Sequence, residues 1–212
     1  MIRVLIADDH AVVREGLKKI LSQNQDISVV AEACDGAEMM EKAQSKGWDV
    51  AILDISLPGR SGLEVLHDLR KIDIKKPILI LSMHPEEQYA VRALKAGAAG
   101  YLNKDSASEE LVAAIRKVAS GSKYVSPRLA EKLAFDLELN SEKLPHELLS
   151  DRESEVFLLI VSGKNLTEIA QQLSLSIKTI STYHARIWEK MNLKNDAELI
   201  LYACRHKLID CN

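Results

Sequence analysis

The stretch VLIADDH, residues 4–10, decides the fold because an apolar run ends abruptly at two adjacent carboxylates, Asp8 and Asp9. Two like charges at close range repel each other, and removing them from water is costly unless something compensates. One interpretation is a solvated turn between a strand and a helix, with Asp9 capping that helix. The other is the edge of a site at which a cation, or a lysine from elsewhere in the chain, meets both carboxylates.

The whole chain has the composition of an ordinary globular protein. Its 212 residues are 47% hydrophobic and 28% charged, which excludes disordered and fibrous classes. No apolar stretch approaches the length of about 20 residues that crosses a bilayer, and the N-terminus lacks the layout of a signal peptide. Three scattered cysteines without metal-ligand spacing, Cys34, Cys204 and Cys211, favour buried thiols in a reducing compartment. We therefore expect a cytoplasmic protein with no membrane partner.

The charge of the chain does not by itself indicate a nucleic-acid partner. The formal net charge is −3, and residues 150–212 carry 8 basic and 8 acidic side chains. No long segment is strongly basic, so any binding to DNA must rest on a local patch of charge.

Residues 1–121 alternate short apolar runs with segments of helical spacing. The runs have the composition of strands buried on both faces of a parallel sheet, and the last helix is predicted to have Ser108 as its N-cap. This alternation predicts an α/β fold, a doubly wound five-stranded parallel sheet with strand order 2-1-3-4-5. The predicted strands are Val4–Ala7, Ile27–Ala33, Val50–Asp54, Ile78–Ser82 and Gly100–Asn103.

Four of these strands end at residues that suit a metal or a phosphoryl group. The first ends at Asp8 and Asp9, the third at Asp54 and the fourth at Ser82, and Lys104 follows the fifth. With the predicted order these ends are neighbours at the carboxyl edge of the sheet, where such folds bind ligands. Three carboxylates suit Mg²⁺, and the metal, the lysine and the hydroxyl together suit a phosphoryl group. Asp54 is the predicted nucleophile.

The alternating pattern stops after Gly121. Residues 122–147 contain Pro127, Pro145 and scattered charge, which indicates a linker with a short helix at 128–137. From residue 148 the pattern is wholly helical, with a capping box at Ser150–Glu153 and a further cap at Ser176. We therefore predict a first domain at 1–121, a linker at 122–147 and a small all-α domain at 148–212.

The first domain resembles the receiver domain of bacterial response regulators of the NarL/FixJ type. The resemblance rests on the paired aspartates after the first strand, LDISLPGRSG around Asp54, LSMH with Ser82 and GYLNKD with Lys104. It implies a flavodoxin-like fold and a sensor histidine kinase that phosphorylates Asp54. It also implies the roles of the pocket residues, which are Mg²⁺ binding by Asp8, Asp9, Asp54 and the backbone carbonyl of Ser56, phosphate binding by Ser82 and Lys104, and an inward swing of Tyr101.

Other interpretations of these residues remain. A hydrolase of the haloacid dehalogenase type also uses an aspartate nucleophile with Mg²⁺, but needs two aspartates one residue apart, and here they are adjacent. Tyr101 is alternatively a half-buried ring on the last strand. His84 either tunes the loss of phosphate or lies on the surface.

The last domain resembles a LuxR-type helix-turn-helix, through the stretch LSDRESEVFLLIVSGKNLTEIAQQLSLSIKTISTYHARIWEKMNL. The resemblance implies helices at 166–173 and 177–190, with the second in the major groove of DNA. Relatives often carry a basic residue at position 181 or 185, so here the methyl group of Thr182 or DNA shape is expected to carry more of the readout. The predicted DNA-facing residues are Ser181, Thr182 and Ala185 near base edges, and Lys178, Thr179, Tyr183, Arg186 and Lys190 at phosphates.

Together the two resemblances imply a phosphorylation-dependent, DNA-binding transcriptional regulator of a two-component system rather than an enzyme. We expect a homodimer in the active state, paired through the final helix from Asp196, with double-stranded DNA and a sensor histidine kinase as partners and RNA polymerase as a further candidate. Two alternatives are a constitutive DNA-binding protein with an unused pocket and an adaptor that acts through protein partners.

Overall fold

The computed structural model describes residues 1–84, 86–127, 129–131, 144–206 and 208–209. The chain forms two compact units, Met1–Glu138 and Leu139–Asn212, which we describe one at a time. The short helix predicted at 128–137 lies largely outside the described residues. Within the described part of the chain, no helix has the length and apolar character that crossing a membrane requires.

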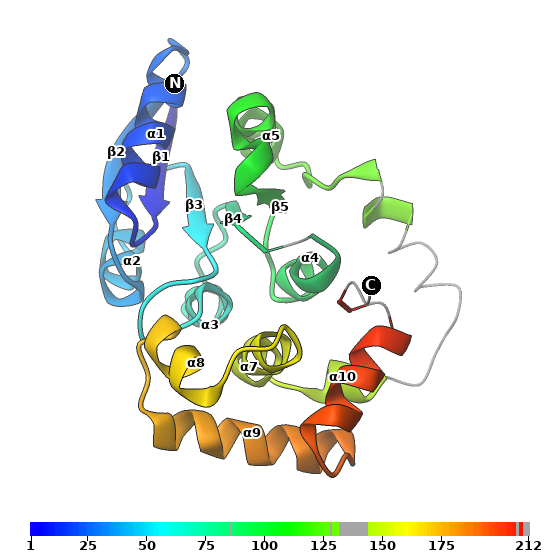
Figure 1. Cartoon of the computed structure of the whole chain (residues 1–212). Coiled ribbons are helices and arrows are strands. Elements are labelled where there is room, and N and C mark those ends of the chain that lie inside the picture. Colours follow the sequence, from blue (N-terminus) through cyan, green and yellow to red (C-terminus); the bar gives the residue numbers. More distant parts are fainter. Residues whose placement is uncertain (85, 128, 132–143, 207, 210–212) are drawn as a thin grey trace. The chain divides into compact units, whose positions relative to one another are not determined.

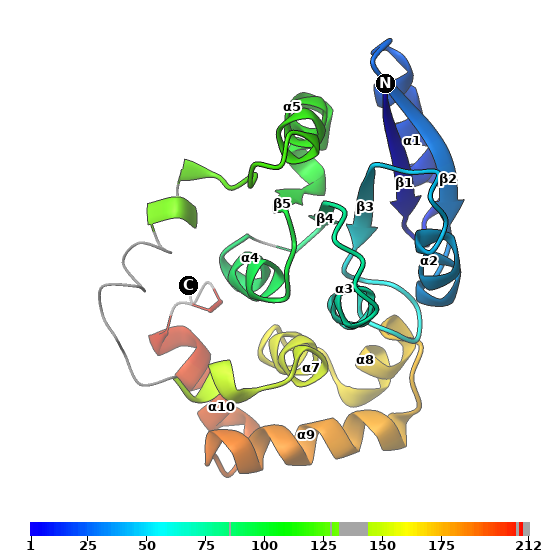
Figure 2. The ribbon, with the colours of Figure 1, turned by 180° about the vertical axis from the view of Figure 1, so that it is seen from behind.

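The first unit contains one parallel sheet in the predicted order, β2-β1-β3-β4-β5. Figure 1 shows β2 at one edge and β5 toward the other, and Figure 2 shows the same sheet from behind. Because all pairings are parallel, the carboxyl ends of the strands lie at one edge of the sheet. The strands are β1 (Ile2–Ala7), β2 (Ile27–Ala33), β3 (Val50–Asp54), β4 (Ile78–Ser82) and β5 (Gly100–Asn103).

Helices cover both faces of this sheet. Leu17 of α1 and Leu111 of α5 pack with Val4, Ile52 and Leu79 of the strands in one apolar core. The strand residues that alternate with these are also fully buried, which confirms the prediction of a sheet buried on both faces. The helices are α1 (Ala11–Ser22), α2 (Gly36–Ala43), α3 (Gly62–Lys71), α4 (Glu86–Lys95), the 3₁₀ turn η1 (Lys104–Ser106) and α5 (Ala107–Ala119).

One helix start differs from the prediction, and another excludes one of the two interpretations of Asp9. His10 rather than Asp9 precedes α1, and it makes no side-chain cap hydrogen bond. Helix α5 begins at Ala107, so Ser108 lies inside the first turn instead of capping it. The reason is η1, which is capped by the side chain of Asn103 and leads directly into α5. The carboxylate of Asp9 is therefore not used to start a helix.

The cysteines also differ from the prediction of buried thiols. Cys34 is exposed just after β2, the edge strand of the sheet. Cys204 takes part in a disulfide bond, and Cys211 lies outside the described residues. The cysteines therefore give no support to the predicted reducing compartment.

A close backbone approach at Gly62 shapes the turn that follows β3. The N–H of Gly62 donates a hydrogen bond to the carbonyl of Ile55 at 2.7 Å. A Cβ atom at Gly62 would lie 2.0 Å from the carbonyl oxygen of Asp54, so only glycine fits. This turn brings the start of α3 against the end of β3.

A second close approach at Gly100 adds the chain after α5 to the sheet. Tyr124 forms an isolated parallel bridge with Gly100 at the free side of β5. The N–H of Tyr124 donates to the carbonyl of Ala99 at 2.9 Å, and the N–H of Tyr101 donates to the carbonyl of Tyr124 at 3.4 Å. A Cβ atom at Gly100 would lie 2.5 Å from the Tyr124 carbonyl oxygen.

The second unit is helical and has its own apolar core. Ser150, Asn165, Ser176 and Asn195 each cap a helix through a side-chain oxygen, which confirms the caps predicted at Ser150 and Ser176. Val156, Ile169, Ile180, Ile187 and Leu199 are among the buried residues that hold the helices together. The elements are the 3₁₀ turn η2 (Pro145–Leu148), α7 (Asp151–Val161), α8 (Leu166–Gln172), α9 (Ile177–Met191) and α10 (Asp196–Arg205).

Candidate functional site: an acidic pocket and a basic helix

Three carboxylates meet at the carboxyl ends of β1 and β3. Asp8 and Asp54 are 1% and 2% exposed, and Asp9 is partly exposed. One oxygen of each carboxylate and a ring nitrogen of His10 all lie within 4.8 Å of one another. The structure thus brings together at one point the three acidic residues that the sequence predicted.

The positive partner of this cluster is Lys104, which follows β5. Its Nζ atom lies 2.7 Å from Oδ2 of Asp8 and 2.8 Å from Oδ2 of Asp54. Burial raises the pKa of Asp54 above its usual 3.8, although Lys104 opposes that shift. Burial lowers the pKa of Lys104, but the two carboxylates outweigh it and the net shift is upward from 10.5. The lysine therefore stays charged while it holds both acids.

One oxygen of the cluster keeps its capacity for a further ligand. Oδ1 of Asp54 is buried and has no hydrogen-bond partner among the described residues. On the open side, His10 donates its backbone N–H to Oδ1 of Asp8 at 2.8 Å, and its Nδ1 lies 2.7 Å from Oδ1 of Asp9. A buried acceptor without a donor is unfavourable, so Asp54 is suited to an incoming electrophile or cation.

The loop after β4 closes another side of the pocket. Ser82 is fully buried, and its Oγ accepts a hydrogen bond from the backbone N–H of His84 at 3.1 Å. Tyr101 is 1% exposed, and its hydroxyl donates to the carbonyl of His84 at 2.7 Å. Asn103 donates to the same carbonyl at 3.3 Å. Tyr101 is therefore turned inward and fixes this loop, and it is not the half-buried ring of the alternative interpretation.

His84 is half-buried rather than an exposed surface residue. Its Nε2 lies 3.2 Å from Oγ of Ser56, on the loop after β3. Its ring stacks on the ring of Tyr89 with the centroids 4.6 Å apart. The side chain thus joins the loop that contains Ser56 to the loop that follows Ser82.

The second part of the candidate site is the outer face of α9. A depression of about 340 Å³ on this face is lined by Ser176, Lys178, Thr179, Thr182, Tyr183 and Arg186. Ser181 and Ala185 are exposed on the same helix. The hydroxyls of Ser181 and Thr182 donate to carbonyls one turn back, at 3.0 and 2.9 Å, which leaves the methyl group of Thr182 as its distinctive feature.

Lys190 differs from the other basic residues of α9. Its Nζ lies 2.6 Å from Oε2 of Glu153, which is 3% exposed and belongs to the capping box of α7. Burial raises the pKa of Glu153, but Lys190 and the N–H of Ser150 outweigh it, so the pKa lies below its usual 4.5. Lys190 therefore joins α9 to α7, and its ammonium group is less available to an external anion than the charged groups of Lys178 and Arg186.

Comparison with protein families assigns both units. Residues 4–116 match the response regulator receiver domain, and residues 147–203 match the bacterial regulatory proteins of the luxR family. The chain belongs to the response regulator family.

Relatives of this response regulator are similar over the full length. The response regulator UvrY of Escherichia coli strain K12 is 38% identical, with 100% of this chain and 97% of the relative covered. The response regulator GacA of Pseudomonas viridiflava is also 38% identical, with 100% of both chains covered. Among solved structures, RcsB of Salmonella enterica serovar Typhimurium, bound to promoter rprA with the phosphomimetic BeF₃⁻, is 30% identical. It has a TM-score of 0.64 and covers 95% of this chain and 98% of its own.

Several contacts of the response regulator's pocket were not predicted from its sequence. Arg14 donates a hydrogen bond to the carbonyl of Asp8 at 2.6 Å, and Asn103 holds the carbonyl of His84. His10 lies against the carboxylates of the pocket. Of these three residues, only His10 could have been found from the sequence, because it directly follows Asp9. The partners of Arg14 and Asn103 depend on the fold.

Proposed function

We propose that this response regulator is a phosphorylation-dependent transcription factor of a two-component system, acting in the cytoplasm. Asp54 is the phosphoacceptor and a sensor histidine kinase is the donor. The observation that carries this proposal is a buried carboxylate whose Oδ2 lies 2.8 Å from Lys104 and whose Oδ1 has no hydrogen-bond partner in the described chain. An oxygen of Asp54 forms the new P–O bond as the P–N bond of the phosphohistidine donor breaks.

The donor set of the pocket fits Mg²⁺. Carboxylate oxygens are the ligands that this ion prefers, and the partnerless Oδ1 of Asp54 would gain a partner from it. Asp8, Asp9, Asp54 and the backbone carbonyl of Ser56 would hold the ion. When bound, it neutralises negative charge on the transferred phosphoryl group. Lys104 balances the remaining charge, and the hydroxyl of Ser82 donates a hydrogen bond to a phosphoryl oxygen.

The loop after β4 is the element that would report phosphorylation. Ser82 at its start faces the phosphoryl group, and Tyr101 and Asn103 hold its backbone at His84. A displacement of Ser82 toward the phosphoryl group would therefore shift the loop after β4, whose backbone is held by Tyr101. Phosphorylation in this proposal shifts a pre-existing equilibrium between two arrangements of the loop.

The output would be DNA binding by α9. The exposed cations Lys178 and Arg186, with Thr179 and Tyr183, would contact phosphates, while Ser181, Thr182 and Ala185 would face base edges. The DNA-bound structure of the relative RcsB supports this role. A homodimer would place two such helices on paired half-sites. Ile200 and Leu201 of α10, which are 40% and 55% exposed, are suited to the dimer contact.

The first test is the intact mass of the protein after incubation with acetyl phosphate and Mg²⁺. We expect a gain of one phosphoryl group in the wild type, and no gain in Asp54→Ala or without Mg²⁺. Asp73→Ala, at an aspartate in the exposed turn before β4, is the matched control and should be phosphorylated normally. A folded wild type that gains no mass would exclude the proposed role of Asp54.

The second test addresses gating of DNA binding. Binding of random-sequence and promoter duplexes is measured over a series of salt concentrations, for the unphosphorylated and the phosphorylated protein. We expect tighter promoter binding and more dimer after phosphorylation. An Asp54→Ala protein that bound and dimerised as tightly as the phosphorylated wild type would refute gating. An absence of salt-dependent binding to any duplex would favour the adaptor alternative.

A further inference from the structure

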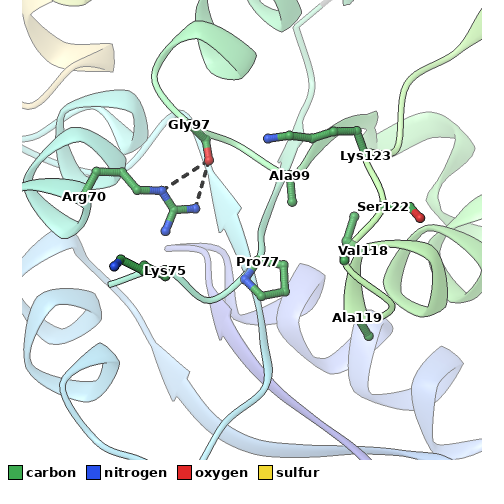
Figure 3. Close-up of a pocket in the computed structure, with 10 residues that line it drawn as sticks. Arg70, Lys75, Pro77, Gly97, Ala99, Val118, Ala119, Ser122 and Lys123 are labelled. Carbon is green, nitrogen blue, oxygen red and sulfur yellow. Dashed lines mark hydrogen bonds between the residues drawn. The ribbon is translucent and has the colours of Figure 1, made fainter. Parts of the chain in front are cut away.

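A second cavity lies at the opposite end of the strands from Asp54. It has a volume of about 380 Å³ and is bordered by Pro77 just before β4 and Ala99 just before β5 (Figure 3). Its volume is within the range of small-molecule sites, about 300–1,000 Å³. The residues that line it are Arg70, Lys75, Pro77, Gly97, Ala99, Val118, Ala119, Gly121, Ser122 and Lys123.

The charge of this lining is entirely positive. Arg70, Lys75 and Lys123 come from three different segments, and none of the described residues that line the cavity is acidic. Figure 3 shows Arg70 and Lys123 on either side of Gly97. The chain as a whole is formally negative, so this concentration of cations is not a reflection of its composition.

Arg70 and Lys123 are held by backbone carbonyls and not by carboxylates. Arg70 donates to Gly97 from Nε at 3.2 Å and from Nη2 at 2.9 Å, and from Nη1 to Ile74 and to Lys76. Lys123 donates to the carbonyl of Ala98. These contacts use four of the five guanidinium N–H groups and one of the three ammonium N–H groups. The described residues therefore leave three charged N–H donors available beside the cavity.

The two cations also repel each other. Burial lowers the pKa of Arg70. Partial burial and the nearby charge of Arg70 lower the pKa of Lys123. An anion between them would relieve this repulsion and accept the remaining N–H groups. Lys75 could add to this charge, because its ion pair with Asp73 is almost fully exposed and therefore weak.

The remaining lining is apolar or weakly polar. Pro77, Ala99, Val118 and Ala119 form one wall, and Ser122 adds a hydroxyl group (Figure 3). An inorganic anion would meet the cations but leave this wall without a contact. We propose that the cavity binds a small organic phosphate, with the phosphoryl group between Arg70 and Lys123 and the organic part against the apolar wall.

Phenyl phosphate is the probe for this proposal. Binding to the full-length protein without Mg²⁺ is measured by titration calorimetry, and the site is located from amide chemical shifts in ¹⁵N-labelled protein. We expect saturable binding with the largest shifts at Gly97, Ser122 and Lys123, and weaker binding of inorganic phosphate. Shifts centred on Ser82 and Lys104 instead would place the probe in the acidic pocket and overturn the proposal.

Three variants test the contacts. Lys123→Gln should weaken phenyl phosphate binding by about ten-fold or more, because a charge-assisted hydrogen bond is lost. Ala119→Leu, which narrows the cavity without removing charge, should weaken phenyl phosphate more than inorganic phosphate. Lys71→Gln removes an equal charge from α3 outside the lining and should change binding less than about two-fold.

The phosphorylation test of Asp54 is independent of these measurements. All variants should be phosphorylated as the wild type is, which shows that they fold. Equal affinity of wild type and Lys123→Gln, or no saturable binding of phenyl phosphate at millimolar concentration, would overturn the proposal.

Discussion

The acidic pocket and the outer face of α9 use charge in opposite ways. In the pocket, the side chains of Asp8 and Asp54 are each 2% exposed and that of Lys104 is 8% exposed, and each carboxylate lies within 2.8 Å of the ammonium group. On α9, Lys178 and Arg186 are exposed, and neither forms an ion pair among the described contacts.

This contrast separates two tasks. Buried charges have to be balanced within the fold, so removal of one leaves another unpaired at high cost. Exposed charges are balanced by water and salt ions, so each contributes little to stability and mainly adds to the attraction for a phosphate backbone. A single substitution in the pocket should therefore disturb all of its charged groups together. Substitutions on α9 should instead each have a small, separate effect.

The strongest test of this contrast is Lys104→Met. Without the ammonium group, two buried carboxylates face each other, and we expect the free energy of unfolding at pH 7 to fall by about 3–5 kcal/mol. Mg²⁺ should restore part of this loss, because it would balance the same carboxylates. Urea denaturation with and without Mg²⁺ measures both effects. Lys71→Met, which breaks an exposed ion pair with Asp68, is the control and should cost less than about 1 kcal/mol. Equal losses of unfolding free energy in Lys104→Met and Lys71→Met would contradict the proposed difference between buried and exposed charges.

The next test asks whether tight packing extends to the edge of the sheet. A Cβ atom at Gly100 would lie 2.5 Å from the carbonyl oxygen of Tyr124, so Gly100→Ala should lower the free energy of unfolding by about 1–3 kcal/mol. Gly16→Ala in α1 is the control, since nothing lies within 4 Å of the added atom. It should stabilise the protein by about 0.5–1 kcal/mol. If Gly100→Ala were as stable as the wild type, the close approach of Tyr124 would not be a constraint.

On the helix, Arg186→Ala should weaken binding to random and promoter duplexes by a similar, several-fold factor. The slope of log affinity against log salt should fall by about 1, with no change in stability. Lys190→Ala should change the slope less, because Glu153 already pairs with its ammonium group. Duplex binding by both variants, measured over a range of salt concentrations, gives the two slopes. Equal slopes for the two variants would show that Lys190 also contacts phosphate.

The smallest expected effect concerns the ion pair that α9 does form. Because the pKa of Glu153 lies below its usual 4.5, its contribution to stability is present above that pH and is lost as the pH falls through the lowered value. Glu153→Gln should therefore cost up to about 1 kcal/mol at pH 7 and less near pH 3, below the usual pKa of the group. Urea denaturation at both pH values measures this difference. A loss of the same size at pH 3 would assign the effect to the cap of α7 and not to charge.

Much of the sheet could be predicted from the sequence, for a physical reason. Strands buried on both faces are continuous apolar runs, and a parallel sheet places their polar ends at one edge. Asp8, Asp54 and Lys104 could therefore be placed together although Lys104 is 50 residues from Asp54. Asp9 was placed in the same pocket by this reasoning, although a carboxylate before a helix has the same local sequence signature whether it caps the helix or faces a pocket.

The contacts that the sequence did not predict are those between side chains of separate elements. The pairing of Lys190 with Glu153 spans 37 residues, and no local pattern marks it. The bond from Tyr101 to the carbonyl of His84 depends on the path of the loop after β4. Tyr124 was missed because a single bridge has no alternation of apolar and polar residues to reveal it.

The bridge at Tyr124 limits where this receiver can be joined to a different output domain. A receiver cut after α5 would lose the segment that covers the free edge of β5, and exposed edges of sheets invite association with other chains. The same segment continues to Ser126, whose hydroxyl bonds to the carboxylate of Glu86 on α4. A chimera that keeps this receiver and replaces its output domain should therefore be joined beyond Ser126, so that both the bridge at Tyr124 and the bond to Glu86 are retained.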